Sequence, residues 1–109
     1  MVKINHIYTA YISWGNGGKR RPILVLKLSK NEYYFYRLTT KFIDKSDQIK
    51  REYFPINDWK QAGLKKQSYI DTSLILSLPI NETRIKLVGK LSIRDRLNLA
   101  TFISNKIKS

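Results

Sequence analysis

The residues of this sequence best suited to chemistry are three consecutive cations, which follow a glycine-rich stretch and precede a proline: Lys19, Arg20 and Arg21. The glycines before them allow positive φ angles and a close approach of the backbone to a ligand. Pro22 fixes its own φ and favours an extended conformation at Arg21, so the last cation sits on a defined backbone. We interpret residues 14–22 as a flexible loop that faces a phosphate group; the alternative is a solvated hairpin loop.

Several other mechanisms lack the residues they need. The chain has eight acidic residues, which form no recognisable magnesium motif, and a single histidine, His6. A ribonuclease that works with two histidines is therefore excluded, and the alternation of the first strand makes His6 a half-buried structural residue. The sequence has no cysteine, no P-loop and no G-x-G-x-x-G stretch. We expect no metal and no cofactor.

RNA cleavage needs fewer protein groups, because the substrate carries its own nucleophile, the 2′-hydroxyl group. The protein has to orient this group, stabilise charge on the phosphorus and move protons. Arg21 provides a planar guanidinium that can hold a phosphate through two hydrogen bonds. A threonine hydroxyl at the end of a neighbouring strand can donate another, and Thr39 and Thr40 stand at such an end. Arginine is a poor proton acceptor, so a further group has to take the proton.

The composition describes a small, strongly basic domain. At 109 residues the chain is long enough for one core, and we expect a single domain over residues 1–109. The formal net charge of +13 comes from cations scattered along the chain, which favours nucleic acid as a partner over an anionic membrane or an acidic protein. No apolar run reaches membrane-spanning length, and residues 1–5 do not resemble a signal peptide. The absence of cysteine suits a cytoplasmic protein.

Alternation in the first segment, a continuous apolar run in the second, aromatic and β-branched residues in the third, and the turn residues along the chain predict six short strands. They cover residues 2–14, 23–28, 32–40, 52–56, 68–76 and 83–91. Residues 29–31 form a hairpin turn, residues 41–51 a mobile loop, and residues 57–63 a single helical turn that a glycine ends. Pro55 marks an edge strand, and Gly89 marks a bulge or a bend. In the first strand we expect one apolar face: Val2, Ile4, Tyr8, Ala10, Ile12 and Trp14.

A C-terminal helix begins at Ser92, which caps it together with Asp95 three residues later. Apolar residues then recur at helical spacing, and we expect this stripe to face the core: Ile93, Leu97, Ala100, Ile103 and Ile107. Six strands and one helix in a chain of this length predict a mainly β (α+β) fold. We expect a small, strongly curled sheet or barrel that the helix caps.

Two stretches of the sequence resemble the MazF/PemK family of bacterial toxin endoribonucleases. Residues 17–26, Gly-Gly-Lys-Arg-Arg-Pro-Ile-Leu-Val-Leu, are similar to the Gly-x-x-Arg-Pro signature and apolar run of that family. The sequence Leu38-Thr39-Thr40 resembles its second active-site element, in which a threonine follows an apolar residue. The order of the elements also matches. The chain departs from the family just before the first strand and in its shorter glycine loop, which affects RNA sequence preference more than catalysis.

The resemblance implies a cytoplasmic SH3-like barrel that forms a homodimer and cuts single-stranded RNA at short motifs without metal. The products would carry a 2′,3′-cyclic phosphate and a 5′-hydroxyl, and a small acidic antitoxin protein would inhibit the enzyme. Arg21 takes the role of the catalytic arginine and Thr39 that of the catalytic threonine, with Thr40 as the fallback. We expect further RNA contacts from the loop and the strand end: Trp14, Gly17, Gly18, Lys19, Arg20, Thr40 and Lys41.

Alternatives to these expectations remain. Trp14 serves equally well as a core or dimer-interface residue. A non-catalytic SH3-like nucleic-acid-binding domain would keep the basic surface without the reaction. A gyrase-poisoning toxin of the same superfamily would act on a protein target and leave RNA intact.

Overall fold

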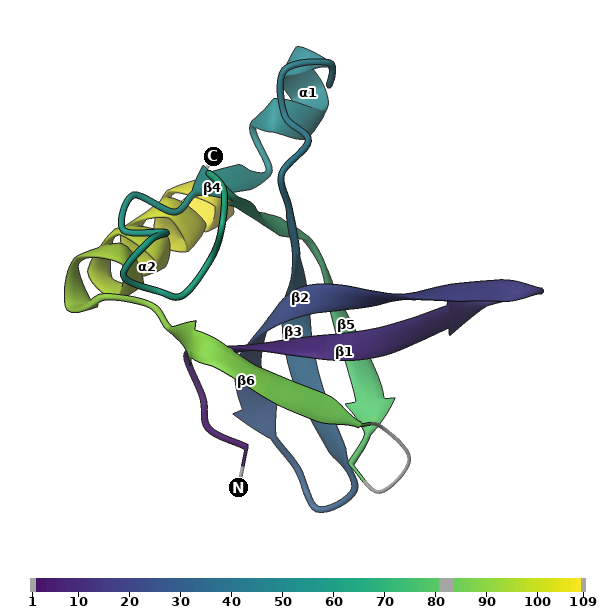
Figure 1. Cartoon of the computed structure of the whole chain (residues 1–109). Coiled ribbons are helices and arrows are strands. Elements are labelled where there is room, and N and C mark those ends of the chain that lie inside the picture. Colours follow the sequence, from purple (N-terminus) through teal and green to yellow (C-terminus); the bar gives the residue numbers. More distant parts are fainter. Residues whose placement is uncertain (1, 81–83, 109) are drawn as a thin grey trace.

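The computed structural model describes residues 2–80 and 84–108, and of Trp14 and Lys108 the backbone alone. This part of the chain forms six strands and two helices (Figure 1). The strands are β1 (His6–Trp14), β2 (Gly17–Leu28), β3 (Glu32–Thr39), β4 (Tyr53–Pro55), β5 (Tyr69–Pro79) and β6 (Ile85–Lys90). The helices are α1 (Asp47–Lys50) and α2 (Ile93–Lys108). The predicted mainly β class with a C-terminal helix is confirmed.

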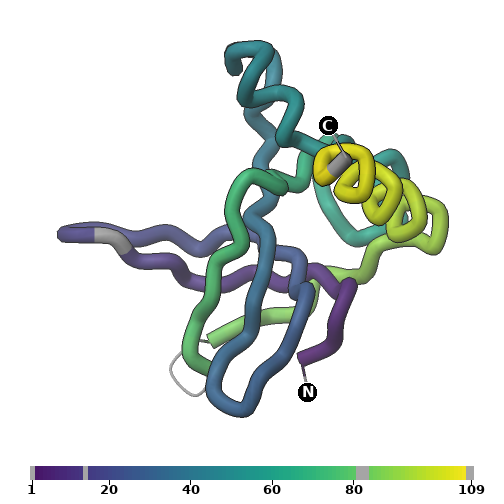
Figure 2. Tube along the Cα trace, turned by 180° about the vertical axis from the view of Figure 1, so that it is seen from behind, coloured from purple at the N-terminus to yellow at the C-terminus, as the bar shows by residue number. Residues whose placement is uncertain are grey.

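The six strands form one antiparallel sheet in the order β4-β5-β3-β2-β1-β6. Its edges are β4 and β6, and Pro55 lies in the edge strand β4, as predicted. Residues 11–14 of β1 and 17–20 of β2 pair only with each other, because the pairing of β1 with β6 ends at Ala10 and that of β2 with β3 ends at Ile23. These two segments, which we call the arm, project from the rest of the sheet (Figure 2).

The sheet carries a core on each face, because side chains alternate along every strand. The core toward α2 contains buried residues of β1 to β5 and of α2, among them Ile7, Leu24, Tyr36, Leu38, Phe54, Ile70 and Leu99. The core on the other face is smaller and comes from β1, β2 and β3: Tyr8, Ala10, Ile23, Val25, Tyr33 and Phe35. Half-buried residues of β5 and β6 pack against this second core, so the sheet curls over it.

Helix α2 packs against the sheet through a face that the sequence pattern did not indicate. Leu99 is buried in the core, and the amine of Lys106 donates to Thr72 Oγ1 at 2.8 Å and pairs with Glu52. The predicted core stripe is wrong for most of its members: Ile93, Leu97 and Ile107 are 73%, 65% and 78% exposed, and Ala100 is exposed too. Of that stripe, Ile103 alone packs against the core. Neither α1 nor α2 has the length and apolar character that crossing a membrane requires.

The first strand and the glycine-rich segment differ from their predictions. The strand begins at His6 instead of residue 2, because Asn5 turns the chain with a φ of 66°, and Ile4 before it is 48% exposed. The glycine-rich segment is not a flexible loop. Only residues 15–16 form the turn, and β2 already begins at Gly17, since the two strands pair as far as Trp14 and Gly17.

Several connections differ from their predictions as well. Residues 41–51 contain α1, which Ser46 caps by accepting a hydrogen bond from Ile49 N at 3.3 Å. Residues 57–63 form consecutive turns with one helical hydrogen bond, from Ala62 N to Asp58 O at 3.0 Å, and Gly63 ends them with a φ of 90°, which agrees with the predicted single turn. Strand β5 continues past residue 76 to Pro79, and residues 81–83, where the sixth strand was expected to begin, lie outside the described residues.

The predicted irregularity at Gly89 is confirmed. Ile7 pairs with Gly89 and Tyr8 with Leu87, which leaves Val88 as the extra residue of a β-bulge. A side chain at Gly89 would collide with the carbonyl oxygen of Ala62. The glycine therefore allows residues 57–63 to pack directly on β6.

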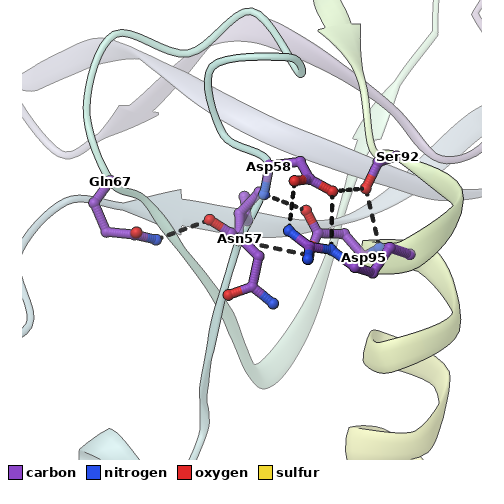
Figure 3. A network of polar contacts seen from close by, with 7 residues as sticks. Asn57, Asp58, Gln67, Ser92 and Asp95 are labelled. Carbon is purple, nitrogen blue, oxygen red and sulfur yellow. Dashed lines mark hydrogen bonds and ion pairs between the residues drawn. The ribbon is translucent and has the colours of Figure 1, made fainter.

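A network of hydrogen bonds fastens residues 57–63 to the start of α2 (Figure 3). The carboxylate of Asp95, which is fully buried, accepts hydrogen bonds from Asn57 N at 3.1 Å and Asp58 N at 2.8 Å. Ser92 Oγ accepts from Asp95 N at 3.1 Å, as the predicted cap requires, and donates to Asp58 Oδ2 at 2.6 Å. The hydrogen bond from Ser92, followed by those from Arg94, lowers the pKa of Asp58 below its ordinary value of 3.8. We call these five residues the Asp95 latch.

The hydrogen bonds of the Asp95 latch predict that Asp95→Asn lowers the stability of the protein. The substitution keeps the size of the side chain, but it replaces one accepting oxygen with an amide donor that faces a backbone N–H. We expect the free energy of unfolding to fall by about 1–3 kcal/mol, because a backbone N–H beside a fully buried side chain loses its partner. Urea unfolding measures the change, with Asp44→Asn, at an exposed acid, as the matched control. Equal stability of the two variants would contradict the role of the latch.

Candidate functional site

Arg21 and Thr39 line the same pocket, which has a volume of about 250 Å³. Three further cations and one carboxylate lie in its wall. The lining residues are Arg21, Arg37, Leu38, Thr39, Lys41, Lys45, Tyr53 and Asp71. We call this cavity the basic pocket. Four cations against one acid suit the binding of a phosphate group.

The register of the sheet explains why these residues meet. Ile23 of β2 pairs with Arg37 of β3, and two residues further along each strand stand Arg21 and Thr39. Side chains two residues apart share a face, so these belong to one side of the sheet. The pairing of β2 with β3 ends at Ile23, and β2 runs on toward the arm in a different direction (Figure 1). The basic pocket lies where these two strands part.

The far side of the basic pocket comes from β5 and β4. Arg37 pairs with Asp71 across β3 and β5, and Asp71 pairs with Tyr53 across β5 and β4. The guanidinium of Arg37 lies 3.4 Å from Asp71 Oδ2, and Ser73 donates to Asp71 Oδ1 from its N at 3.0 Å and its Oγ at 2.5 Å. These bonds fix the carboxylate, whose residue is only 8% exposed, at the wall of the pocket.

Thr39 is oriented by its own backbone. Its Oγ1 accepts a hydrogen bond from Lys41 N at 3.1 Å, which is a local turn where β3 ends. A hydroxyl that accepts in this way keeps its O–H for donation. Thr39 can therefore donate to a phosphate oxygen in the basic pocket. Thr40 is exposed and does not line it, so the register favours Thr39 over the fallback.

The remaining predicted contacts are spread over two faces. Lys41 lines the basic pocket, and Lys19 is exposed on the arm, on the same face of β2 as Arg21. Arg20 points to the opposite face, where its guanidinium donates to Thr9 O at 3.4 Å and Thr9 Oγ1 at 3.3 Å. The structure does not bring Arg20 to the pocket.

The structure around Gly17 and Gly18 of the arm explains these glycines without an RNA contact. A Cβ on Gly18 would come within 2.5 Å of Tyr11 Oη, so the glycine leaves room for the Tyr11 ring. Gly17 begins β2 beside the turn and does not line the basic pocket. The side chain of Trp14 lies outside the described residues.

Sequence reasoning missed four of the polar and charged residues that line the basic pocket: Arg37, Lys45, Tyr53 and Asp71. A signal for Arg37 was present, since it stands two residues before Thr39 and follows Tyr33 and Phe35 on the same face. A charge at this point of an apolar alternation marks the place where the core ends and a solvent-facing site begins. Asp71 gave no such signal, because its partner is 34 residues away in the chain.

Comparison of the sequence with models of known protein families and with curated proteins finds no match. The resemblance to the MazF/PemK family therefore rests on the two motifs quoted above and remains a prediction.

The charges around Tyr53 provide a test of this geometry. Burial, and after it the negative charge of Asp71, raise the pKa of Tyr53 above its ordinary value of 10.0, while Arg37 lowers it. We expect Asp71→Asn to bring the pKa of Tyr53 down toward the ordinary value and Arg37→Gln to raise it further. A pH titration of the Tyr53 ring by NMR measures both. Shifts of the same sign in the two variants would contradict the arrangement.

Proposed function

We propose that the protein is a metal-independent endoribonuclease that cuts single-stranded RNA through attack of the 2′-hydroxyl on the neighbouring phosphorus. The observation that supports this most is the meeting of Arg21 and Thr39 in one basic pocket. The two residues were selected from separate motifs 18 positions apart. The register of β2 and β3 brings these two residues to one face of the sheet, where an arginine and a hydroxyl can act on the same phosphate.

The cations of the basic pocket suit the negative charge that develops on a phosphorane. Charge grows on the non-bridging oxygens as the 2′-oxygen attacks, and preorganised donors then gain strength. Arg21 and Arg37 present planar guanidinium groups, which match two oxygens of one phosphorus. Thr39 adds a neutral donor, and the lysines 41 and 45 raise the potential of the whole pocket.

The bonds that form and break in the reaction that we assign to this site both belong to the substrate. The 2′-oxygen forms a bond to phosphorus, the bond from phosphorus to the 5′-oxygen breaks, and a 2′,3′-cyclic phosphate results. The proton of the 2′-hydroxyl goes to a base, the departing 5′-oxygen takes a proton from water, and the hydroxide that remains takes the proton back from the base. Arginine cannot accept the first proton. Asp71 carries the one carboxylate that lines the basic pocket among the described residues, and we assign it as the acceptor.

The wider identity belongs to the same proposal. A toxin of a type II toxin–antitoxin pair, built on an SH3-like barrel and acting as a cytoplasmic homodimer, agrees with the two motifs. The charge of +13 suits both RNA and a small acidic antitoxin as partners. A non-catalytic nucleic-acid-binding domain needs no oriented hydroxyl beside its cations, and Thr39 therefore favours the enzyme.

The proposal predicts a large difference between two neighbouring arginines. We expect Arg21→Gln to slow cleavage of a long single-stranded RNA in EDTA by about 100- to 1000-fold, because a donor to the developing charge is lost. Arg20→Gln removes the same charge from the opposite face of β2 and should keep most of the activity. Rates of fragment formation on gels measure both variants.

The controls separate the alternatives. A filter-binding assay at the same salt concentration reports RNA affinity, which we expect to fall by a similar small factor in the two variants. Equal cleavage rates for Arg21→Gln and Arg20→Gln would contradict the assigned role of Arg21. If the natural sequence binds RNA without cleaving it, the non-catalytic domain is favoured. If it neither binds nor cleaves RNA, the gyrase-poisoning toxin is favoured.

A further inference from the structure

We propose that a second cavity, next to the basic pocket, binds the unpaired base of the nucleotide whose phosphate enters the basic pocket. This inference rests on the proposed function. It adds a base-binding site that the two sequence motifs of the protein did not indicate. The cavity has a volume of about 390 Å³, and Thr40, Lys41, Phe42, Gln67 and Tyr69 are among its lining residues. We call it the aromatic pocket.

Two parallel rings form the characteristic feature of the aromatic pocket. The centroids of Phe42 and Tyr69 lie 4.3 Å apart with an angle of 8° between the ring planes. Both side chains are only half-buried, although they are large and flat. Lys50 Nζ lies over the ring of Phe42, 5.1 Å from its centroid, so we expect a nucleobase to extend the stack at the ring of Tyr69. Any nucleobase can do so, because every base has a π face. Phe42 also lies near Tyr53, at 6.4 Å between centroids, and Tyr53 already lines the basic pocket.

The aromatic pocket and the basic pocket are neighbours in the sheet. Lys41 lines both cavities. Tyr69 of β5 pairs with Thr39 of β3, and directly paired residues place their side chains side by side on one face. A phosphate oxygen held by Thr39 would therefore lie beside the ring of Tyr69. This is the relation that a nucleotide needs between its phosphate and its base.

The rim of the aromatic pocket offers contacts for a ligand that is apolar on its faces and polar at its edge. Ile43 is 84% exposed, more than any other large apolar side chain among the described residues. Gln67 donates from Nε2 to Ile56 O at 2.9 Å and to Ser68 O at 3.1 Å, which fixes the amide and leaves Oε1 to accept. A base edge that carries N–H groups fits this acceptor.

The test compares two single-stranded 2′-deoxy oligonucleotides of equal length, one with bases and one with abasic sites throughout. Neither can be cleaved, because both lack the attacking hydroxyl. We expect the natural sequence to bind the base-bearing strand about tenfold more tightly, and Phe42→Leu to reduce this ratio toward one while binding of the abasic strand is kept. Fluorescence anisotropy measures the four dissociation constants. Tyr34→Leu, at a half-buried aromatic on the opposite face of β3, is the matched control and should keep the ratio.

The outcomes distinguish this inference from the proposed function. An unchanged ratio in Phe42→Leu, or an equal loss of affinity for both strands, would overturn the aromatic pocket even if the protein cleaves RNA. A reduced ratio together with an absence of RNA cleavage would support the base site and overturn the enzyme. If Phe42→Leu does not fold by circular dichroism, Tyr69→Leu removes the other ring of the stack and is judged by the same ratio.

Discussion

The pairing of Arg37 with Asp71 across β3 and β5 is the contact on which the site depends. It sets the register in which Thr39 stands opposite Tyr69, and Asp71 opposite Tyr53 of the edge strand. A slip by one residue would send Asp71 to the other face of the sheet, into the core beneath α2. The ion pair itself is weak, since the Arg37 side chain is 51% exposed and solvent screens it. The ion pair matters for position instead: Ser73 fixes the Asp71 carboxylate through two hydrogen bonds, and this carboxylate orients Arg37.

One face of the sheet therefore serves two purposes along the same strands. Near the β2–β3 turn it buries Tyr33, Phe35 and Val25 in an apolar core. Toward the other end the same alternation continues with Arg37 and Thr39, and the strands diverge. The buried core makes this part of the sheet rigid. The divergence of β2 and β3 leaves the space that forms the basic pocket. Helix α2 and the Asp95 latch act from outside this region, because they cover the opposite face and the β6 edge.

The sequence allowed the strand-level description and one half of the site to be predicted. Aromatic and β-branched residues identified β3 within one residue. Arg21 and Thr39 were found because each stands in a recognisable local motif. The orientation of α2 was mispredicted for a physical reason. The face of α2 that meets the rest of the protein includes Asp95 and Lys106. Asp95 accepts hydrogen bonds from the backbone of residues 57–58, and Lys106 donates to β5. A search for apolar residues at helical spacing cannot detect charged residues that face inward because they have such partners. Asp71 and Tyr69 were missed because only strand pairing brings them to the site.

The groups at the new ends of the RNA fragments reveal whether the substrate's own 2′-hydroxyl is the nucleophile. A defined single-stranded RNA is incubated with the protein in EDTA, and the fragments are examined by mass spectrometry for the groups at their new ends. The account predicts a 2′,3′-cyclic phosphate on one fragment and a 5′-hydroxyl on the other, since the attacking oxygen belongs to the substrate. Fragments that carry a 3′-hydroxyl and a 5′-phosphate, or an RNA that remains whole, would contradict it.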